Sequence, residues 1–141
     1  MAQIYRTVHK DKHYVIGVAL SNLAGVYHKR QRYSEAEQLF RDVLRRYGTE
    51  LAADHQLVDI ARVRLGTALV PQRKYADAER ELLAGYQILI KQSTPPPAWV
   101  ESARKELVAV YDSLDRRADA DKVRAELAAA AQKSAEVAAA K

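Results

Sequence analysis

The sequence predicts an all-α protein, built as a solenoid in which three pairs of antiparallel helices stack one on the next. Two observations lead to this fold class. Apolar residues recur with the period of a helix that is buried on one face, and one pattern of residues returns every 42 positions. The columns that keep this register are Leu23, Leu65 and Leu107, together with Ala36, Ala78 and Ala120.

Residues 1–10 are expected to be the end of a truncated preceding repeat, because a shift of 42 positions places Tyr5 under Tyr47. Repeats that bury their faces on neighbours favour the interpretation that the chain is a piece of a longer array, with a native capping helix as the alternative. We expect a helix break between His9 and His13.

The first unit is predicted over residues 11–50. Leu20, Leu23, Ala24 and Tyr27 follow the i, i+3, i+4, i+7 spacing of its first helix. A second helix follows residues 30–32, with its apolar stripe on Ala36, Leu39, Phe40, Val43 and Leu44. We expect it to end at Gly48.

The second unit is predicted over 51–94, the third over 95–127, and an Ala-rich helical extension over 128–141. Pro71 separates the two helices of the second unit, since proline is costly inside a helix. Asp54 and Thr94 are candidate helix caps. Small residues such as Ala24 and Gly66 predict a close approach of paired helices.

Two pairs of strings repeat, Ser21-Asn22-Leu23-Ala24-Gly25-Val26-Tyr27 with Arg32-Tyr33-Ser34-Glu35-Ala36-Glu37, and Arg64-Leu65-Gly66 with Lys74-Tyr75-Ala76-Asp77-Ala78-Glu79. They resemble the tetratricopeptide repeat, in the 42-residue form found in kinesin light chains and many bacterial proteins. The third unit is similar to the last repeat in C-terminal arrays of bacterial eukaryotic-like serine/threonine kinases. The resemblance covers about residues 13–127 and implies a right-handed α-solenoid that binds a protein segment.

In that family the first helix of each unit lines a concave groove, so the resemblance implies a partner-binding surface. Asn22 matches an Asn that family members use to hold a ligand backbone. The carboxylate clamp of chaperone-binding relatives is not reproduced, because Ser21 and Gly25 stand where its cation and amide would be. The groove residues expected here are Val18, Ser21, Asn22, Gly25, Lys29, Ile60, Val63, Arg64, Thr67, Ser102 and Lys105. A solvated helix face is the alternative reading of all of them.

The sequence indicates no enzyme. It has no Cys and no nucleophile elbow, and its five Gly are too scattered for a phosphate-binding loop. His9 and His13 have an i, i+4 spacing but no carboxylates complete a metal site, so we expect no metal and no cofactor. His13 and His55, again 42 apart, match a position where this repeat form often has His at the entry to the first helix, so the resemblance implies a hydrogen-bonding structural role for both.

Charge is concentrated in the turns inside the units. The chain has 23 Lys and Arg against 18 Asp and Glu, a net charge of +5. Aligned turns would form a basic edge that could attract nucleic acid or an acidic partner, although cations are also favoured at helix C-termini. The residues of this basic edge are Arg30, Arg32, Arg73, Lys74, Arg116 and Arg117.

The outward face of the first helix is a predicted self-association surface. We expect Val15, Val18, Ala19 and Val26 to be covered only by the short segment that holds Ile4, Tyr5 and Val8, which favours a homodimer. No apolar run is long enough to span a membrane. A soluble, cytoplasmic chain is expected, with the periplasm left open because a chain without Cys suits either. The functions under consideration are therefore a protein-binding scaffold, a nucleic-acid or acidic-partner module, and a structural or multimerising spacer.

Overall fold

The computed structural model describes the backbone of residues 2–140 and the side chains of residues 14–140. Within this part the chain forms six α-helices and one short 3-10 helix, and no strand. The elements are α1 (Ala2–Lys29), α2 (Tyr33–Glu50), α3 (Gln56–Leu69), η1 (Val70–Gln72), α4 (Tyr75–Leu89), α5 (Pro97–Ser113) and α6 (Arg117–Ala139). The predicted all-α fold class is confirmed.

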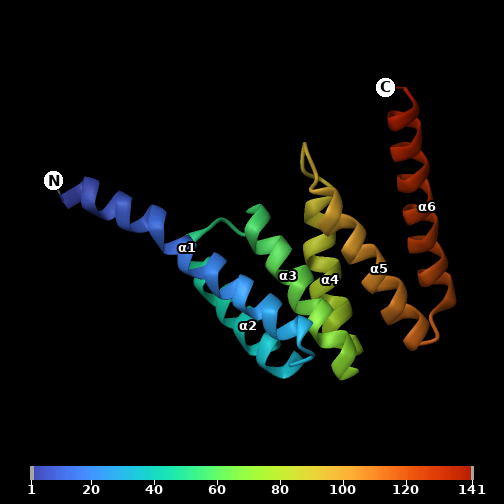
Figure 1. Ribbon diagram of the computed structural model, residues 1–141, viewed down its shortest axis with the longest axis horizontal. Coiled ribbons are helices and arrows are strands. Elements are labelled where there is room, and N and C mark those ends of the chain that lie inside the picture. The colour runs from blue at the N-terminus through green and yellow to red at the C-terminus, as the bar shows by residue number, and fades with distance from the viewer. Residues whose placement is uncertain (1, 141) are drawn as a thin grey trace.

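The helices pack as three consecutive pairs. α1 contacts α2, α3 contacts α4 and α5 contacts α6, while α2 and α4 also pack against the first helix of the following pair. The result is a row of hairpins with α1 at one end and α6 at the other (Figure 1). Direct contact between α3 and α5 brings successive first helices onto one common face, which is called the first-helix face below.

The turn inside each pair has the same backbone device. Gln31, Arg73 and Asp115 adopt the left-handed conformation, with φ of 64°, 63° and 57°, and they lie 42 residues apart. One left-handed residue ends the first helix and redirects the chain into the second. In the middle pair this residue directly follows η1, which contains the predicted breaker Pro71.

The core is built on the small-residue columns that the sequence predicts. Ala36, Ala78 and Ala120 are all fully buried. A Cβ on Gly66 would lie 2.5 Å from Leu82 Cγ, so α3 and α4 approach as closely as a missing side chain allows. Larger apolar side chains, among them Phe40, Leu65, Leu69, Leu82, Leu89 and Leu107, fill the space between the pairs.

The burial predicted for Leu23 is wrong. Leu65 and Leu107 are 1% and 0% exposed, but Leu23 is 43% exposed. The difference follows from position in the stack. α3 packs against both α2 and α4, and α5 packs against both α4 and α6, whereas α1 packs chiefly on α2. Identical registers therefore do not give equal environments.

Several predicted helix boundaries are also wrong. α1 runs without a break from Ala2 to Lys29, so the interruption expected between His9 and His13 does not occur, and residues 2–10 are not a separate helix. Ile4, Tyr5 and Val8 continue this helix and do not fold back over it, and their side chains lie outside the described residues. α2 continues past Gly48 to Glu50.

The helix caps differ from those expected as well. His55, not Asp54, caps α3 by accepting a hydrogen bond from the Leu57 N–H on Nδ1 at 3.1 Å. This confirms the structural role predicted for His55, while the side chain of His13 lies outside the described residues. α5 is preceded by Pro96, not by the candidate cap Thr94. None of the described helices has the length and apolar content needed to cross a membrane.

Candidate functional site

Arg64 occupies the centre of the first-helix face. Its guanidinium carbon lies 5.1 Å from the centroid of the Phe40 ring and 5.4 Å from that of the Trp99 ring, and Nη1 donates a hydrogen bond to Ser21 Oγ at 2.9 Å. A guanidinium is attracted electrostatically to the face of an aromatic ring. Four helices, α1, α2, α3 and α5, thus fix the position of this one cation.

Gly25 on α1 makes room for the guanidinium. A Cβ at this position would lie 2.3 Å from Arg64 Nη2, closer than any contact that a side chain tolerates. The spacing explains why glycine suits a position inside an α-helix, where it costs about 1 kcal/mol relative to alanine. Gly25 on α1 therefore leaves the space that the Arg64 guanidinium from α3 occupies.

Arg64 has no counter-ion among the residues that the structure describes. Burial lowers the pKa of Arg64 from its usual value, which records the cost of removing its charge from water. Partly buried charges are normally paired, so an unpaired one on an open face is a candidate binding determinant.

A pocket of about 160 Å³ opens beside Arg64 where α1, α3 and α5 meet. Its volume is below the roughly 300 Å³ at which small-molecule sites begin, and it suits a single side chain. The pocket is lined by Gly25, His28, Lys29, Phe40, Arg64, Thr67, Trp99 and Ser102, and is called the Arg64 pocket below.

His28 contributes a second unsatisfied group to the Arg64 pocket. Its Nε2 is buried without a hydrogen-bond partner, and its ring packs edge-on against Tyr33 with centroids 5.1 Å apart. Burial lowers the pKa of His28, the charge of Arg64 lowers it further, and the backbone of Thr67 opposes both. His28 is consequently favoured in its neutral form, as a hydrogen-bonding side chain and not as a second cation.

The structure brings together five of the predicted groove residues, which are Gly25, Lys29, Arg64, Thr67 and Ser102. Ser21 lies beside them, but it is buried and serves as the acceptor for Arg64, so the expectation that it faces a partner directly is wrong. Val63 is also wrong as a groove residue, because it is fully buried in the core, where its Cγ2 faces Gly85 of α4.

Four more of the predicted groove residues, besides Ser21 and Val63, lie outside the Arg64 pocket. Asn22 is exposed on α1, and Lys105 is exposed on α5 with its Nζ 2.9 Å from Glu101 Oε1. Val18 is half-buried, and Ile60 packs against the core. Glu106, which shares the 42-residue column of Asn22 and Arg64, is partly buried, and burial raises its pKa.

Sequence reasoning missed His28, Phe40 and Trp99 as parts of the site. His28 could have been found, since it lies three residues after Gly25 on the same helix face. Phe40 has the spacing of a core residue, and Trp99 falls in a column with Val15 and Leu57, so neither carries a sequence signal for a binding face.

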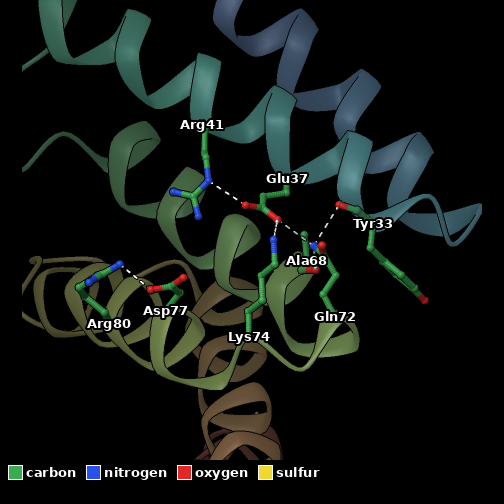
Figure 2. A network of polar contacts seen from close by, with 8 residues as sticks. All are labelled: Tyr33, Glu37, Arg41, Ala68, Gln72, Lys74, Asp77 and Arg80. Carbon is green, nitrogen blue, oxygen red and sulfur yellow. Dashed lines mark hydrogen bonds and ion pairs between the residues drawn. The ribbon is translucent and has the colours of Figure 1, made fainter.

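Three of the six basic-edge cations make ion pairs. Arg32 pairs with Glu35, Lys74 with Glu37, and Arg116 with Glu79 and Asp119. Figure 2 shows the middle case, in which Lys74, Arg41 and Gln72 converge on the Glu37 carboxylate. Over the part of the chain with described side chains, Arg30, Arg73 and Arg117 make no ion pair.

A larger hollow of about 590 Å³ lies between the start of α5 and the second half of α6. Its charged members are already satisfied, because Glu101 pairs with Lys105, and Arg104 donates to the Tyr86 hydroxyl at 2.9 Å. None of the predicted groove residues lines it. Among residues with described side chains, no cluster of His, Asp and Glu is arranged to hold a metal ion.

Comparison with protein families places the repeat pattern in a known class. The family model described as tetratricopeptide repeat matches residues 15–91, which is more than half of the chain and includes α2, α3 and α4. A search of curated proteins found no match to this chain.

Proposed function

Because the chain belongs to the tetratricopeptide repeat family, whose repeats generally mediate protein–protein interactions, we propose that it binds an extended segment of a partner protein along the first-helix face. The observation that carries this proposal is the Arg64 pocket of about 160 Å³, which opens beside a partly buried guanidinium that has no counter-ion among the described residues. Extended segments supply single side chains to pockets of this size while their backbone lies along the surface.

The same geometry favours binding over catalysis. No carboxylate lines the pocket, and the Thr67 hydroxyl already donates a hydrogen bond to the Val63 carbonyl at 3.0 Å. Peptide binding is also favoured over nucleic-acid binding at the basic edge, because three of its six cations, Arg32, Lys74 and Arg116, already pair with carboxylates of the protein. The function we propose is that of a non-catalytic scaffold with its site on α1, α3 and α5.

A library of random dodecapeptides on beads tests the proposal, with labelled wild-type protein as the probe. Ser102→Trp places a large side chain at the mouth of the Arg64 pocket, and Ser34→Trp makes the same change at an exposed position on α2. We expect wild type and Ser34→Trp to enrich one common set of peptides that Ser102→Trp fails to retain. Equal retention by Ser102→Trp, or no enrichment over bare beads, would contradict the proposal.

Self-association is a second candidate, and the outward face of α1 favours it. Ile16, Ala19, Leu23 and Val26 are exposed on α1, yet the residues 42 positions later, Val58, Ala61, Leu65 and Ala68, are all buried. The third unit repeats this burial with Val100, Ala103, Leu107 and Val110. The face on α1 therefore has the pattern of a helix-packing surface, and we propose that it pairs with the same face of a second copy.

Sedimentation over a concentration series tests this second candidate. Leu23→Lys with Val26→Lys adds two charges to the proposed contact, while Val137→Lys adds a charge to an exposed apolar residue on α6. We expect wild type and Val137→Lys to dimerise and the double variant to stay monomeric. A monomeric wild type, or a double variant that dimerises equally well, overturns the proposed contact.

A further inference from the structure

We propose that the Arg64 pocket accepts a carboxylate side chain, aspartate or glutamate, from the bound segment, an inference that rests on the proposed function. It names the chemistry that the partner must present at the centre of the site.

The unpaired charge requires an anion. Arg64 is partly removed from water and has no carboxylate partner among the described residues, whereas most other arginines on the second helices and turns are paired. A carboxylate from a partner would compensate this charge. The free-energy cost of removing the guanidinium from water arises on folding, so binding does not add that cost in full.

The guanidinium is held ready for such a partner. Two aromatic rings and the Ser21 hydroxyl fix its plane, so little side-chain freedom is left to lose on binding. An arginine has five N–H donors, and the one hydrogen bond that Arg64 makes within the described residues uses a single donor. The remaining donors can form the paired hydrogen bonds that match a carboxylate.

The rest of the lining also suits an anion. Lys29 adds a cation at the exposed rim, and Ser102 adds a hydroxyl able to donate a hydrogen bond. No Asp or Glu lines the Arg64 pocket. An acidic side chain therefore meets complementary charge with no opposing carboxylate, and a lysine or arginine of a partner would meet repulsion.

The size of the pocket favours a single side chain of a bound peptide over a larger free ligand. At about 160 Å³ it holds a carboxylate and its methylene stem between the Trp99 ring and α1. The flanking peptide would then lie over exposed residues of α1 and α5, including Asn22 and Lys105.

The test uses four libraries of acetylated, amidated nonapeptides with random flanks and a central Glu, Asp, Gln or Asn. Blocking both ends excludes a terminal carboxylate as the source of binding. For wild type we expect at least roughly tenfold greater retention of the Glu and Asp libraries than of their amide counterparts, the difference expected for a charge-assisted pair. In Arg64→Met this preference should disappear.

A matched control and a stability measurement separate binding from a merely structural role. Arg30→Met removes the same charge from an exposed neighbour outside the pocket, and it should keep the full acidic preference. Arg64→Met should melt at the same temperature as wild type or higher, because an unpaired, desolvated cation is lost while the stem still packs on Phe40 and Trp99. If Arg64→Met does not fold, Gly25→Ala serves instead, since its methyl group displaces Arg64 Nη2 without removing charge.

Each outcome decides the matter. Equal retention of acidic and amide libraries by wild type overturns the carboxylate inference and leaves peptide binding intact, and so does an acidic preference that survives both Arg64→Met and Gly25→Ala. Failure of wild type to retain any of the four libraries overturns the proposed function together with this inference. Loss of the preference in Arg30→Met would assign it to net charge and not to the Arg64 pocket.

Discussion

Glu37 Oε1 accepts a hydrogen bond from Lys74 Nζ at 2.9 Å across the junction between the first and second helix pairs. Glu79 and Arg116, each 42 residues later, form the same pair at the next junction. The acid lies on the second helix of one unit and the cation in the turn of the following unit. Two of the basic-edge cations, Lys74 and Arg116, thus form ion pairs that join successive repeats.

The Glu37 network should contribute to stability. Burial raises the pKa of Glu37, but hydrogen bonds from Lys74, Arg41 and Gln72 outweigh burial and hold the pKa below its usual value. A carboxyl whose pKa is lower in the folded protein than in the unfolded chain stabilises the fold at pH above its unfolded-state pKa. This contribution is lost as the pH falls through its folded-state pKa. Glu37→Gln should cost about 1–2 kcal/mol in urea unfolding at neutral pH, and much less near pH 3.

Glu35→Gln is the control for that measurement. Glu35 forms an exposed pair with Arg32 inside a single unit, and exposed pairs contribute about 0–1 kcal/mol. A loss as large as that of Glu37→Gln, or a Glu37→Gln cost that does not depend on pH, would assign the effect to something other than the junction.

The close approach of α3 and α4 predicts opposite effects for two glycine substitutions. In Gly66→Ala the new Cβ would meet Leu82 Cγ at 2.5 Å and Cδ2 at 2.8 Å, so Leu82 must move in a packed core. Overpacking of this kind costs about 1–3 kcal/mol, which exceeds the gain of about 1 kcal/mol from replacing glycine in a helix. Gly48→Ala meets no atom within 4 Å and should stabilise. Denaturant unfolding of both variants measures the difference, and equal signs would contradict the packing argument.

The left-handed turn residues predict a stabilising glycine. Gln31 has a φ of 64°, a conformation that costs a residue with a Cβ about 1–2 kcal/mol and that glycine adopts freely. Gln31→Gly should therefore raise the free energy of unfolding by about 1 kcal/mol. Gln38→Gly makes the same change at an exposed position inside α2 and should lower it by about 1 kcal/mol. Thermal melts compare the two, and a loss in Gln31→Gly would show that the turn does not strain its residue.

The 42-residue register predicts most of the fold and less of the site. It gives the three helix pairs and the buried column of Ala36, Ala78 and Ala120 because these features repeat with the sequence. It cannot tell which units have neighbours on both sides, and the burial predicted for Leu23 fails for that reason.

The candidate site shows the same limit at a smaller scale. Arg64 was expected on the first-helix face from its column, but its contacts with Ser21, Phe40 and Trp99 join three other helices. Such contacts depend on the tertiary distances between helices, which leave no periodic signal in the chain.

The last prediction concerns Asp59, whose side chain is wholly buried in the first turn of α3. Oδ1 lies 3.5 Å from Arg62 Nη1, while Oδ2 has no hydrogen-bond partner among the described residues.

Burial raises the pKa of Asp59 to about 6, with Arg62 opposing and Asp54 adding to the rise. Because the folded pKa lies above the unfolded value of 3.8, the folded protein holds this proton more tightly than the unfolded chain between those values. The charged carboxylate therefore destabilises the fold above about pH 6, and this cost disappears as the pH falls toward 4.

Asp59→Asn should consequently raise the free energy of unfolding near pH 7.5 by an amount on the order of 1–2 kcal/mol, since the amide removes the buried charge but leaves a polar group to satisfy. Near pH 4.5 the gain should be smaller, because the wild-type carboxyl is then protonated in the folded state. Asp121→Asn removes a charge from an exposed pair with Arg124 and should change stability by less than about 0.5 kcal/mol at either pH. Urea titrations at both pH values measure the effect. An Asp59→Asn gain that is equal at the two pH values, or a loss near pH 7.5, would mean that the buried carboxylate is stabilised by its surroundings and is not a cost to the fold.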